Sequence, residues 1–507
     1  MKAKKSIRRI VIAIFALLLL LPMGAGAKSN DHLKIATWED VSTFDPGWMT
    51  SGERELTIMS CLFNGLVKYK EGSWDIVPDL AESWDVSPDG LSVVFHLRKG
   101  VQFHKGYGEM TAEDVKFSYE RILDPALKSP EKGQWEQLDH VEIVDKYTVK
   151  LIFKTKKVTL FTSLLPMNTG YIVSQKAVKS LGHEKFGKNP VGTGPYELDS
   201  WKPKQHVELQ KFDKYWGEAP KINKITFLPI AEDSTCETAL KTGEIQIGRS
   251  SMINYKSFKK NSKFNVYSKP PLKTYWLGMT VNKAPFDKIE LREAFRYAVD
   301  VDMIVEAAFY GTAKRANTVL PPGLPDYWKE APAYKQNIKL AKSLMKKGGK
   351  PDGFTVKLFI PANDAERIMA EVIKADAAKA GIDVIIEVKE IGAFNEAANK
   401  GETDAYIQFY TSTIDPYYLM QWFAGESTWN PSQWHSAEFT NLMKMGNSES
   451  DLEKRNQIYV DAQKLIDKDA WAIWLTHGTK FWIAQSNLNI GLIYPNGRLA
   501  PWTASFE

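Results

Sequence analysis

The chain has 507 residues, of which 44% are hydrophobic and 25% are charged, a composition typical of soluble globular proteins. Its 66 lysine and arginine residues exceed its 61 aspartate and glutamate residues by five, but five positive charges lie within the first nine residues, so the remainder is electrically balanced. That balance excludes the charge footprint of a nucleic-acid-binding protein, and the length exceeds what one hydrophobic core normally holds, so at least two domains are expected.

The N-terminus has the pattern of a cleavable secretory signal peptide. Five positive charges precede a wholly apolar stretch from Ile10 to Leu21, and Ala25-Gly26-Ala27 supplies small residues for cleavage, so the mature chain is expected to begin near Lys28. The apolar stretch is shorter than the roughly 20 residues that a membrane-spanning helix needs. The residue directly after the cleavage site is Lys28 and not a cysteine, which favours a freely diffusing periplasmic protein over a lipid-anchored one.

Strand and helix patterns alternate along the first half of the chain. Apolar residues at every second position from Leu91 to Leu97 predict a strand with one buried face. Thr111 is expected to cap a helix that ends at Asp124-Pro125. Further strands are expected at 141–153, 205–211, 222–229, 263–268 and 275–281.

Helices become longer in the second half. The spacing of apolar residues predicts a helix from Leu291, a further helix capped by Asp300, and another opened by Asn363 and followed by a strand through 384–388. Ser450 and Glu453 have the spacing of a capping box for a helix whose inward face would carry Ile458, Ala462, Leu465 and Ile466. Strands followed by helices between 270 and 480 predict an α/β lobe of its own.

The sequence shows none of the common catalytic motifs. There is no nucleophile elbow, no Walker loop, no Cys-x-x-Cys and no His-Glu-x-x-His, so we expect neither catalytic residues nor a cofactor. Gly192-Thr193-Gly194-Pro195 is expected to be a tight turn, because Pro195 removes an amide donor that a phosphate loop would need. The eight histidines are scattered, so no metal site is expected, although a site built from His104 and His435 stays open. Pairing of Cys61 with Cys236 also stays open.

A series of motifs in the same order resembles the peptide/nickel class (family 5) of ABC-transporter solute-binding proteins. The motifs are Pro78–Trp84, Phe95–Val101, Thr111–Val115, Val191–Tyr196, Tyr215-Trp216, Asn282–Asp287, Leu291–Ala294 and Ala298–Asp300. Because they extend over most of the mature chain, the resemblance is specific.

The resemblance implies a two-lobed α/β fold of the Venus flytrap type, class II. Lobe I would comprise 28–270 plus 480–507, with an extra subdomain at about 75–190, and lobe II would comprise 271–479. Such receptors bind a ligand between their lobes, do no chemistry, and deliver the ligand to the permease subunits of an ABC importer in the inner membrane. The usual state would be a monomer. A sensory binding protein is a second possibility, and a periplasmic hydrolase is disfavoured by the motif search.

The resemblance also points to ligand-binding residues. They are Thr50, Ser51 and Gly52, which resemble a segment that pairs with a peptide backbone; Tyr275 and Trp276; and Phe409, Tyr410 and Ser412. For each aromatic residue, core packing is the alternative.

Two departures from the pattern bear on the ligand. Peptide receptors of this class place an aspartate where this chain has Ser412, and dipeptide receptors have an arginine where the stretch Phe359–Asp364 has none. Either Asp415 replaces the missing amine anchor, which favours a small peptide-like or amino-acid-derived ligand, or the ligand lacks a free α-ammonium group, as a sugar, an opine-like conjugate or a metal chelate would.

Overall fold

The computed structural model describes residues 31 to 507 except 39, 49–52, 71, 270–272, 323, 325, 412–414, 424–428, 479 and 495–496. The expected signal peptide and the expected site residues Thr50, Ser51, Gly52 and Ser412 lie outside the described residues. Within the described part, no helix is both long and apolar enough to cross a membrane.

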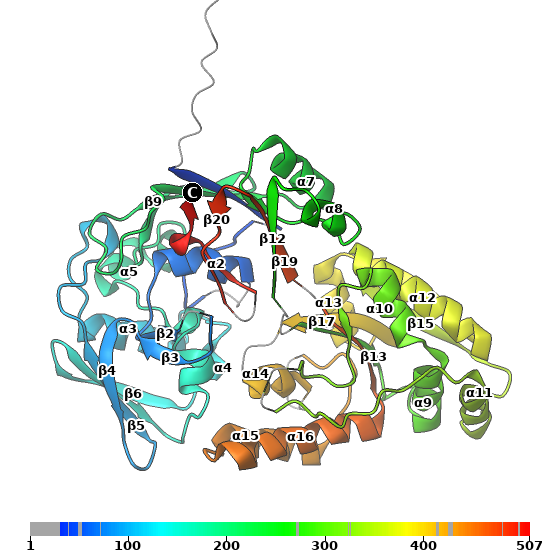
Figure 1. Ribbon diagram of the computed structural model, residues 1–507. Helices are drawn as coiled ribbons and strands as arrows, with labels where there is room; N and C mark the ends of the chain where they lie inside the picture. Colours follow the sequence, from blue (N-terminus) through cyan, green and yellow to red (C-terminus); the bar gives the residue numbers. More distant parts are fainter. Residues whose placement is uncertain are drawn as a thin grey trace, which may run out of the picture.

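A seven-stranded sheet forms the centre of the first lobe, which we call lobe I (Figure 1). Its strands, in spatial order, are β12 (Phe264–Lys269), β19 (Lys480–Gln485), β11 (Ile247–Gly248), β1 (His32–Thr37), β10 (Lys224–Pro229), β9 (His206–Lys211) and β8 (Tyr196–Lys202). β1 runs parallel to both β10 and β11. The helices of this lobe include α2 (Glu53–Leu62), α5 (Gln175–Leu181), α6 (His183–Phe186), α7 (Asp233–Thr242) and α8 (Tyr255–Lys259).

A smaller antiparallel sheet lies beside the core of lobe I, at the lower left of Figure 1. It contains β4 (Ala81–Val86), β5 (Ser92–Leu97), β7 (Thr148–Phe153) and β6 (Leu138–Asp145), accompanied by α3 (Ala112–Leu123) and α4 (Lys132–Trp135). A two-stranded hairpin of β2 (Val67–Tyr69) and β3 (Ile76–Pro78) and the π-helical turn η2 (Leu160–Leu164) lie nearby in the chain.

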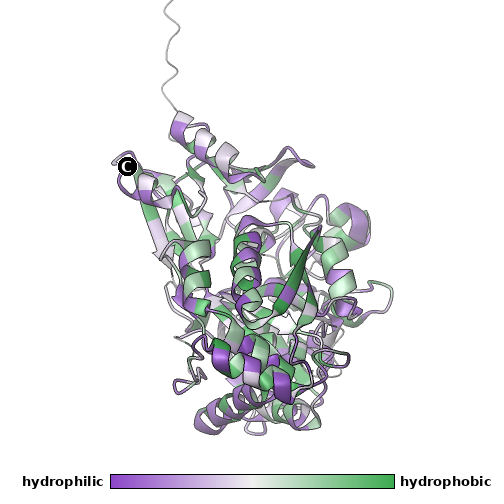
Figure 2. Ribbon diagram, turned by 90° about the vertical axis from the view of Figure 1, so that its right-hand side faces the viewer, coloured by the Kyte–Doolittle hydropathy of each residue, from purple (hydrophilic) through white to green (hydrophobic). Residues whose placement is uncertain are grey.

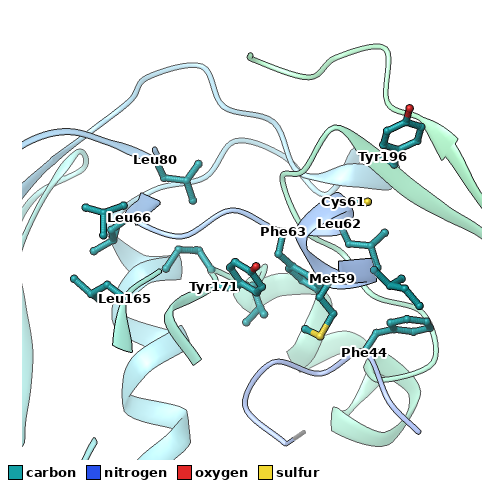
Figure 3. Close-up of a cluster of buried hydrophobic side chains, with 14 of the residues drawn as sticks. Phe44, Met59, Cys61, Leu62, Phe63, Leu66, Leu80, Leu165, Tyr171 and Tyr196 are labelled. Atoms are coloured by element: carbon teal, nitrogen blue, oxygen red, sulfur yellow. The ribbon is translucent and has the colours of Figure 1, made fainter. Parts of the chain in front are cut away.

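One continuous hydrophobic core joins these parts of lobe I. Figure 3 shows Phe63, at the end of α2, facing Tyr171, and their ring centroids lie 6.1 Å apart at an interplanar angle of 13°. The same core includes Ile490 and Leu499 from the C-terminal segment, which also forms the short strands β20 (Leu488–Asn489), β21 (Leu492–Ile493), β22 (Leu499–Ala500) and β23 (Ser505–Phe506). The C-terminal residues therefore complete the core of the lobe that the N-terminal residues begin.

A six-stranded sheet forms the second lobe, lobe II, between residues 273 and 477. Its strands, in spatial order, are β14 (Lys314–Arg315), β18 (Ala472–His477), β13 (Lys273–Met279), β17 (Ala405–Thr411), β15 (Phe354–Pro361) and β16 (Ile382–Lys389). The helices are α9 (Ile289–Ala298), α10 (Val301–Phe309), α11 (Ile338–Lys347), α12 (Asp364–Ala380), α13 (Ile391–Asn399), α14 (Pro416–Met420), α15 (Ala437–Ser448) and α16 (Leu452–Asp469).

Hydrophobic residues cover both faces of the lobe II sheet. One face packs against α9–α12 through Tyr275, Leu277 and Met279 of β13, and the other packs against α13–α16 through Trp276 of β13 and Trp474 of β18. In Figure 2, hydrophobic residues gather on the strands, and hydrophilic residues lie along the outermost helices and loops. Because successive side chains of a strand point to opposite faces of the sheet, Tyr275 and Trp276 of β13 belong to two different clusters.

Most of the expected elements are confirmed. The strand from Leu91 is β5, the helix capped by Thr111 is α3 with both hydrogen bonds of a capping box, and Asp300 caps α10 by accepting hydrogen bonds from the amides of Asp302 and Met303. The fold class, two-lobed α/β, is the one expected.

Two local predictions were wrong. The single strand expected at 141–153 is a hairpin of β6 and β7, because the Asp145 carboxylate accepts the Tyr147 amide at 2.7 Å and turns the chain. The cap of α16 is Asp451 rather than Ser450, with the Lys454 amide donating to its carboxylate at 3.1 Å. The buried stripe of α16 accordingly includes Arg455 and Tyr459, and Ile458 and Leu465 are only half-buried.

Candidate ligand-binding site

The topology brings the carboxyl ends of the parallel strands of both lobes to one interface. In lobe II, β15 runs parallel to β16 and β17, so all three end at the edge where β13 begins. In lobe I, β1, β10 and β11 end at the edge where β12 also ends. The chain passes from β12 to β13 and returns from β18 to β19, so these two edges face each other (Figure 1). Ligands of open α/β sheets bind at such carboxyl ends.

Two residues of lobe I, Trp38 and Arg249, follow directly after strands at this edge. Trp38 follows β1 and is 56% exposed, and the Arg249 guanidinium, after β11, lies 4.5 Å from the Trp38 ring centroid. Arg249 is buried, with its Nε 2.8 Å from the Asp233 carboxylate and its Nη2 donating to the carbonyls of Ile230 and Ala231. Burial raises the pKa of Asp233, and Arg249 lowers it. The arginine is therefore held in place by the protein, and the indole above it faces solvent.

The lobe II edge carries a lysine among aromatic rings. Lys273 is the first residue of β13, and its Nζ lies 3.6 Å from the ring centroid of Phe409 and 4.6 Å from that of Tyr275. Burial lowers the pKa of Lys273 to about 8, and the charge of Glu366 in the first turn of α12 acts in the opposite direction. Glu366 is buried and accepts a hydrogen bond from Asn363 Nδ2 at 3.3 Å.

The expected aromatic residues occupy different surroundings. Trp276 is 2% exposed and packs edge-on against Phe423 at 5.8 Å, within the cluster of α13–α16. Tyr275 is buried on the other face of the sheet, 5.4 Å from the Phe309 ring centroid and 5.2 Å from that of Phe409. Phe409 and Tyr410 of β17 are both half-buried. Phe409 and Tyr275 thus lie together, whereas the contacts of Trp276 are those of a core residue.

Asp415 lies in a buried network of hydrogen bonds. Its carboxylate oxygens lie 2.8 and 3.0 Å from Arg455 Nη2, and the Tyr417 amide donates to it at 3.0 Å at the start of α14. A third donor comes from lobe I, because the Thr162 hydroxyl of η2 donates to Asp415 at 2.8 Å. A ligand ammonium group at this position would have to compete with Arg455.

Contacts such as the Thr162–Asp415 hydrogen bond show that the lobes touch. Trp74, in the loop between β2 and β3, packs on the Tyr69 ring of lobe I and also against the cluster of α13–α16 in lobe II. The Thr312 hydroxyl of lobe II donates to the Met252 sulfur of lobe I at 3.7 Å. The structure is therefore that of a closed state.

The residues considered for chemistry have structural contacts. His104 is buried, its Nε2 donating to the Gly194 carbonyl at 2.9 Å and its Nδ1 accepting the Gly192 amide at 3.3 Å. A Cβ atom at Gly192 would collide with the Leu62 carbonyl, so the Gly192–Pro195 turn packs closely on the end of α2. Among the described residues, no three histidine, cysteine or acidic side chains group as metal ligands would. Cys61 and Cys236 are both buried free thiols.

A small cavity with a mixed polar and apolar lining lies within lobe I, apart from the facing edges. Its volume is about 40 Å³, and its lining includes Lys68, Asp79, Tyr215 and Arg498. A space of this size holds only a few water molecules. It is too small for a peptide-sized ligand.

Sequence reasoning identified Phe409, Tyr410 and Asp415 at or near the lobe II edge but missed Trp38, Arg249, Lys273 and Glu366. None of these four belongs to a motif. The available signal was positional: Trp38 and Arg249 follow a strand at the carboxyl edge, Lys273 begins one there, and Glu366 lies in the first turn of the helix after β15. Recognising this signal requires the order of strands in the sheet.

The sequence and the fold of this chain are similar to those of known solute-binding proteins. Residues 75–431 match the model of bacterial extracellular solute-binding proteins, family 5 (middle part). The dipeptide-binding protein of Escherichia coli K12 is 30% identical over 486 residues, which cover 90% of this chain and 91% of that protein. Helicobacter pylori DppA in complex with the peptide STSA has a TM-score of 0.85 at 28% identity, covering 94% of this chain and 98% of that one. MoaA of A. tumefaciens R10 in complex with mannopinic acid has a TM-score of 0.83 at 26% identity, covering 94% and 99%.

Proposed function

Because this chain belongs to family 5 of the bacterial extracellular solute-binding proteins, we propose that it captures a small peptide-like or amino-acid-derived solute between its lobes. It delivers this solute to the permease subunits of an ABC importer in the inner membrane. The exported chain begins near Lys28, acts in the periplasm as a monomer, and binds no nucleic acid.

The proposal depends chiefly on one observation: the carboxyl edges of the two sheets face each other, and the chain connects the two lobes twice. Rotation of one lobe relative to the other, about the connections from β12 to β13 and from β18 to β19, would separate the edges without breaking either sheet, as in hinge closure around a ligand. We keep the lobe boundaries expected from the sequence, 28–270 plus 480–507 for lobe I and 271–479 for lobe II, because the strands of each sheet fall within them.

The protein acts without covalent chemistry in this proposal. The relatives are binding proteins, and the histidines and cysteines that might serve a hydrolase are held in structural contacts: His104 bonds to the Gly192–Gly194 turn, and both thiols are buried.

Ligand contacts are assigned to the lobe II edge, at Phe409 and Tyr410, and to Thr50, Ser51, Gly52 and Ser412. Tyr275 packs against the Phe409 ring, and Trp276 packs in the core between the sheet and α13–α16. Asp415 remains a candidate anchor only if a ligand ammonium displaces Thr162 or Arg455 from it.

The occupied carboxylate of Asp415 favours a second candidate, a receptor for a non-peptide conjugate. A solute without a free α-ammonium group needs no anchor at Ser412 or Asp415, and MoaA shows that a protein of this fold binds the non-peptide compound mannopinic acid.

Differential scanning calorimetry of the refolded secreted form (28–507) tests the proposal and separates the candidates. A ligand present at a thousand times its Kd stabilises the protein by about 4 kcal/mol. Free di- to tetrapeptides are compared with their N-acetylated forms and with mannopinic acid. A rise in Tm with free peptides alone supports the peptide receptor with amine recognition; a rise with acetylated peptides or mannopinic acid supports the second candidate. No rise with any of these compounds would contradict the proposed ligand class.

A further inference from the structure

Lys273 is a positively charged side chain for which the described residues provide no counter-ion. Its Nζ forms no ion pair and no hydrogen bond with any of them, and its nearest neighbours are the rings of Phe409 and Tyr275 at 3.6 and 4.6 Å. Cation–π contacts offset only part of the cost of removing an ammonium group from water. An ammonium group has three donors and no acceptor, so the missing partner must be an acceptor.

The position of Lys273 makes a ligand the natural source of that acceptor. Lys273 pairs with Thr411, the last residue of β17, and follows directly after the crossing from lobe I. It therefore lies at the lobe II edge that faces lobe I, and it is half-buried rather than enclosed.

Glu366 does not neutralise this charge by direct contact. The Glu366 residue is 2% exposed, and its carboxylate already accepts a hydrogen bond from Asn363. Burial raises the pKa of Glu366, and Lys273 lowers it; burial likewise lowers the pKa of Lys273. The two groups therefore act on each other electrostatically, and no Lys273–Glu366 ion pair within 4.0 Å is present among the described residues.

A second lysine at the same edge, Lys389, has both an aromatic contact and a counter-ion. Lys389, the last residue of β16, lies with its Nζ 4.2 Å from the Phe359 ring centroid, but 3.5 Å from the Glu387 carboxylate. Lys389 therefore has the same kind of ring contact and a counter-ion, whereas Lys273 has the ring contacts alone.

We propose that Lys273 binds a carboxylate of the ligand, so that the solute captured between the lobes is an anion or a zwitterion bound through its acid group. The inference rests on the proposed function and specifies its substrate class. The stretch 359–364 contains no arginine that could bind an acid group of the ligand. In this proposal Lys273 of β13 has that role instead. A charge-assisted hydrogen bond of this kind is short and strong.

The first test uses acetate, the carboxylate alone, and needs no identified ligand. In protein labelled with ¹³C at lysine Cε, the Lys273 resonance is assigned by its absence from the spectrum of Lys273→Met. Titration with acetate against chloride at constant ionic strength should shift this resonance in the wild type and in Lys389→Met. Lys273→Arg, which keeps the positive charge, should still gain Tm in acetate, and Lys273→Met should not. A Lys273 resonance that responds equally to acetate and chloride overturns the proposal.

The second test compares a peptide with its C-terminal amide. The wild type should bind the acid at least tenfold more tightly than the amide, and Lys273→Met should bind the two equally. If acid and amide bind the wild type equally, the proposal fails while the receptor function stands. If no peptide binds but acetate still shifts Lys273, the ligand class of the proposed function fails and the anion site stands. The Tm of unliganded Lys273→Met verifies folding; it should equal or exceed that of the wild type, because an uncompensated charge has been removed.

Discussion

Charged side chains at the facing edges differ in whether the protein already neutralises them. Arg249 is paired with Asp233, and Asp415 with Arg455, so each position is fixed by a partner that the chain itself supplies. Lys273 has aromatic neighbours instead. A charge without a partner in the closed state is the one whose energy a ligand can change most.

Affinity for a carboxylate should therefore fall as the pH rises through the pKa of Lys273. That pKa is about 8, and the group is charged below it. Glu366 is the charged group that acts on it, and its carboxylate favours the charged form of Lys273. Acetate affinity measured by the Lys273 resonance should drop by about tenfold between pH 7 and pH 9. A constant affinity in Lys273→Arg over this range is the control; an affinity that rises with pH would contradict the assignment.

A second pH effect concerns stability and comes from His104. Burial lowers its pKa to about 4 from 6.5, and its Nδ1 accepts the Gly192 amide, which a protonated ring could not do. Because the folded pKa lies below the unfolded one, the unfolded state binds more protons between pH 4 and 6.5. The contribution of neutral His104 to the free energy of unfolding is therefore fully present above pH 6.5. It decreases as the pH falls, by about 2 kcal/mol at pH 5.

Calorimetry at pH 7 and pH 5 checks this expectation. The Tm of the wild type should fall on acidification, and that of His104→Gln should fall less. An equal decrease in both proteins would show that other groups bind the protons.

Residue roles of this kind were only partly predictable. The sequence pattern grouped Phe409, Tyr410 and Asp415 as ligand contacts, which stays a prediction, but it contained no sign that Asp415 faces Arg455, which lies 40 residues further on in α16. Likewise, nothing local distinguishes Lys273 from Lys389. Which charges find partners depends on tertiary contacts that local periodicity does not encode.

The strand β13 shows why aromatic residues were hard to assign at the level of elements. It lies between β17 and β18 in the middle of the sheet, and helices cover both faces. A strand buried on both faces reads as a continuous apolar run. The sequence therefore predicted burial of Tyr275 and Trp276 equally well as ligand contact.

Replacing Trp276 by Ala should destabilise the protein by about 3–5 kcal/mol, because it leaves a cavity in the cluster of α13–α16. Trp38→Ala is the matched control: Trp38 is 56% exposed, so its loss should change stability little and should act on ligand affinity instead. Denaturant unfolding of the two variants measures the difference. Equal stability of Trp276→Ala and the wild type would return Trp276 to the list of ligand contacts.

The predicted boundaries of two elements were wrong because a polar side chain changed the direction of the backbone there. Asp145 ended β6 inside a run that the apolar pattern read as one strand, and Asp451 took the cap of α16 one residue beyond Ser450. Both aspartates accept a backbone amide two or three residues ahead, so both act locally. Hydrophobic periodicity detects the faces of elements, and it misses such turns because they involve one side chain each.

At the scale of the whole molecule, the order of elements was the most predictable feature. Ordered motifs along most of the chain predicted two lobes, and the chain connects the two sheets twice, from β12 to β13 and from β18 to β19. What the motifs could not indicate is how the lobes touch. Thr162, Trp74 and Met252 belong to no motif, yet each contacts lobe II.

The Thr162–Asp415 hydrogen bond provides a way to change the closed state without changing either lobe. Thr162→Val keeps the shape of the side chain and removes the hydroxyl that lobe I donates to Asp415, leaving the Asp415–Arg455 pair intact. The bond should contribute about 0.5–1.5 kcal/mol to closure, so the open state should become roughly two- to tenfold more populated. Small-angle scattering of the unliganded protein should show a larger radius of gyration at an unchanged Tm.

Asp415→Asn separates this effect from a loss of folding. It removes one partner of a buried ion pair and leaves Arg455 without its counter-charge, which costs about 3–5 kcal/mol. Its Tm should therefore fall, whereas that of Thr162→Val should not. If Thr162→Val lowers the Tm as much as Asp415→Asn does, then the hydrogen bond stabilises the fold rather than the closed arrangement. If Asp415→Asn keeps the wild-type Tm but loses binding of free peptides, then Asp415 is a ligand anchor after all.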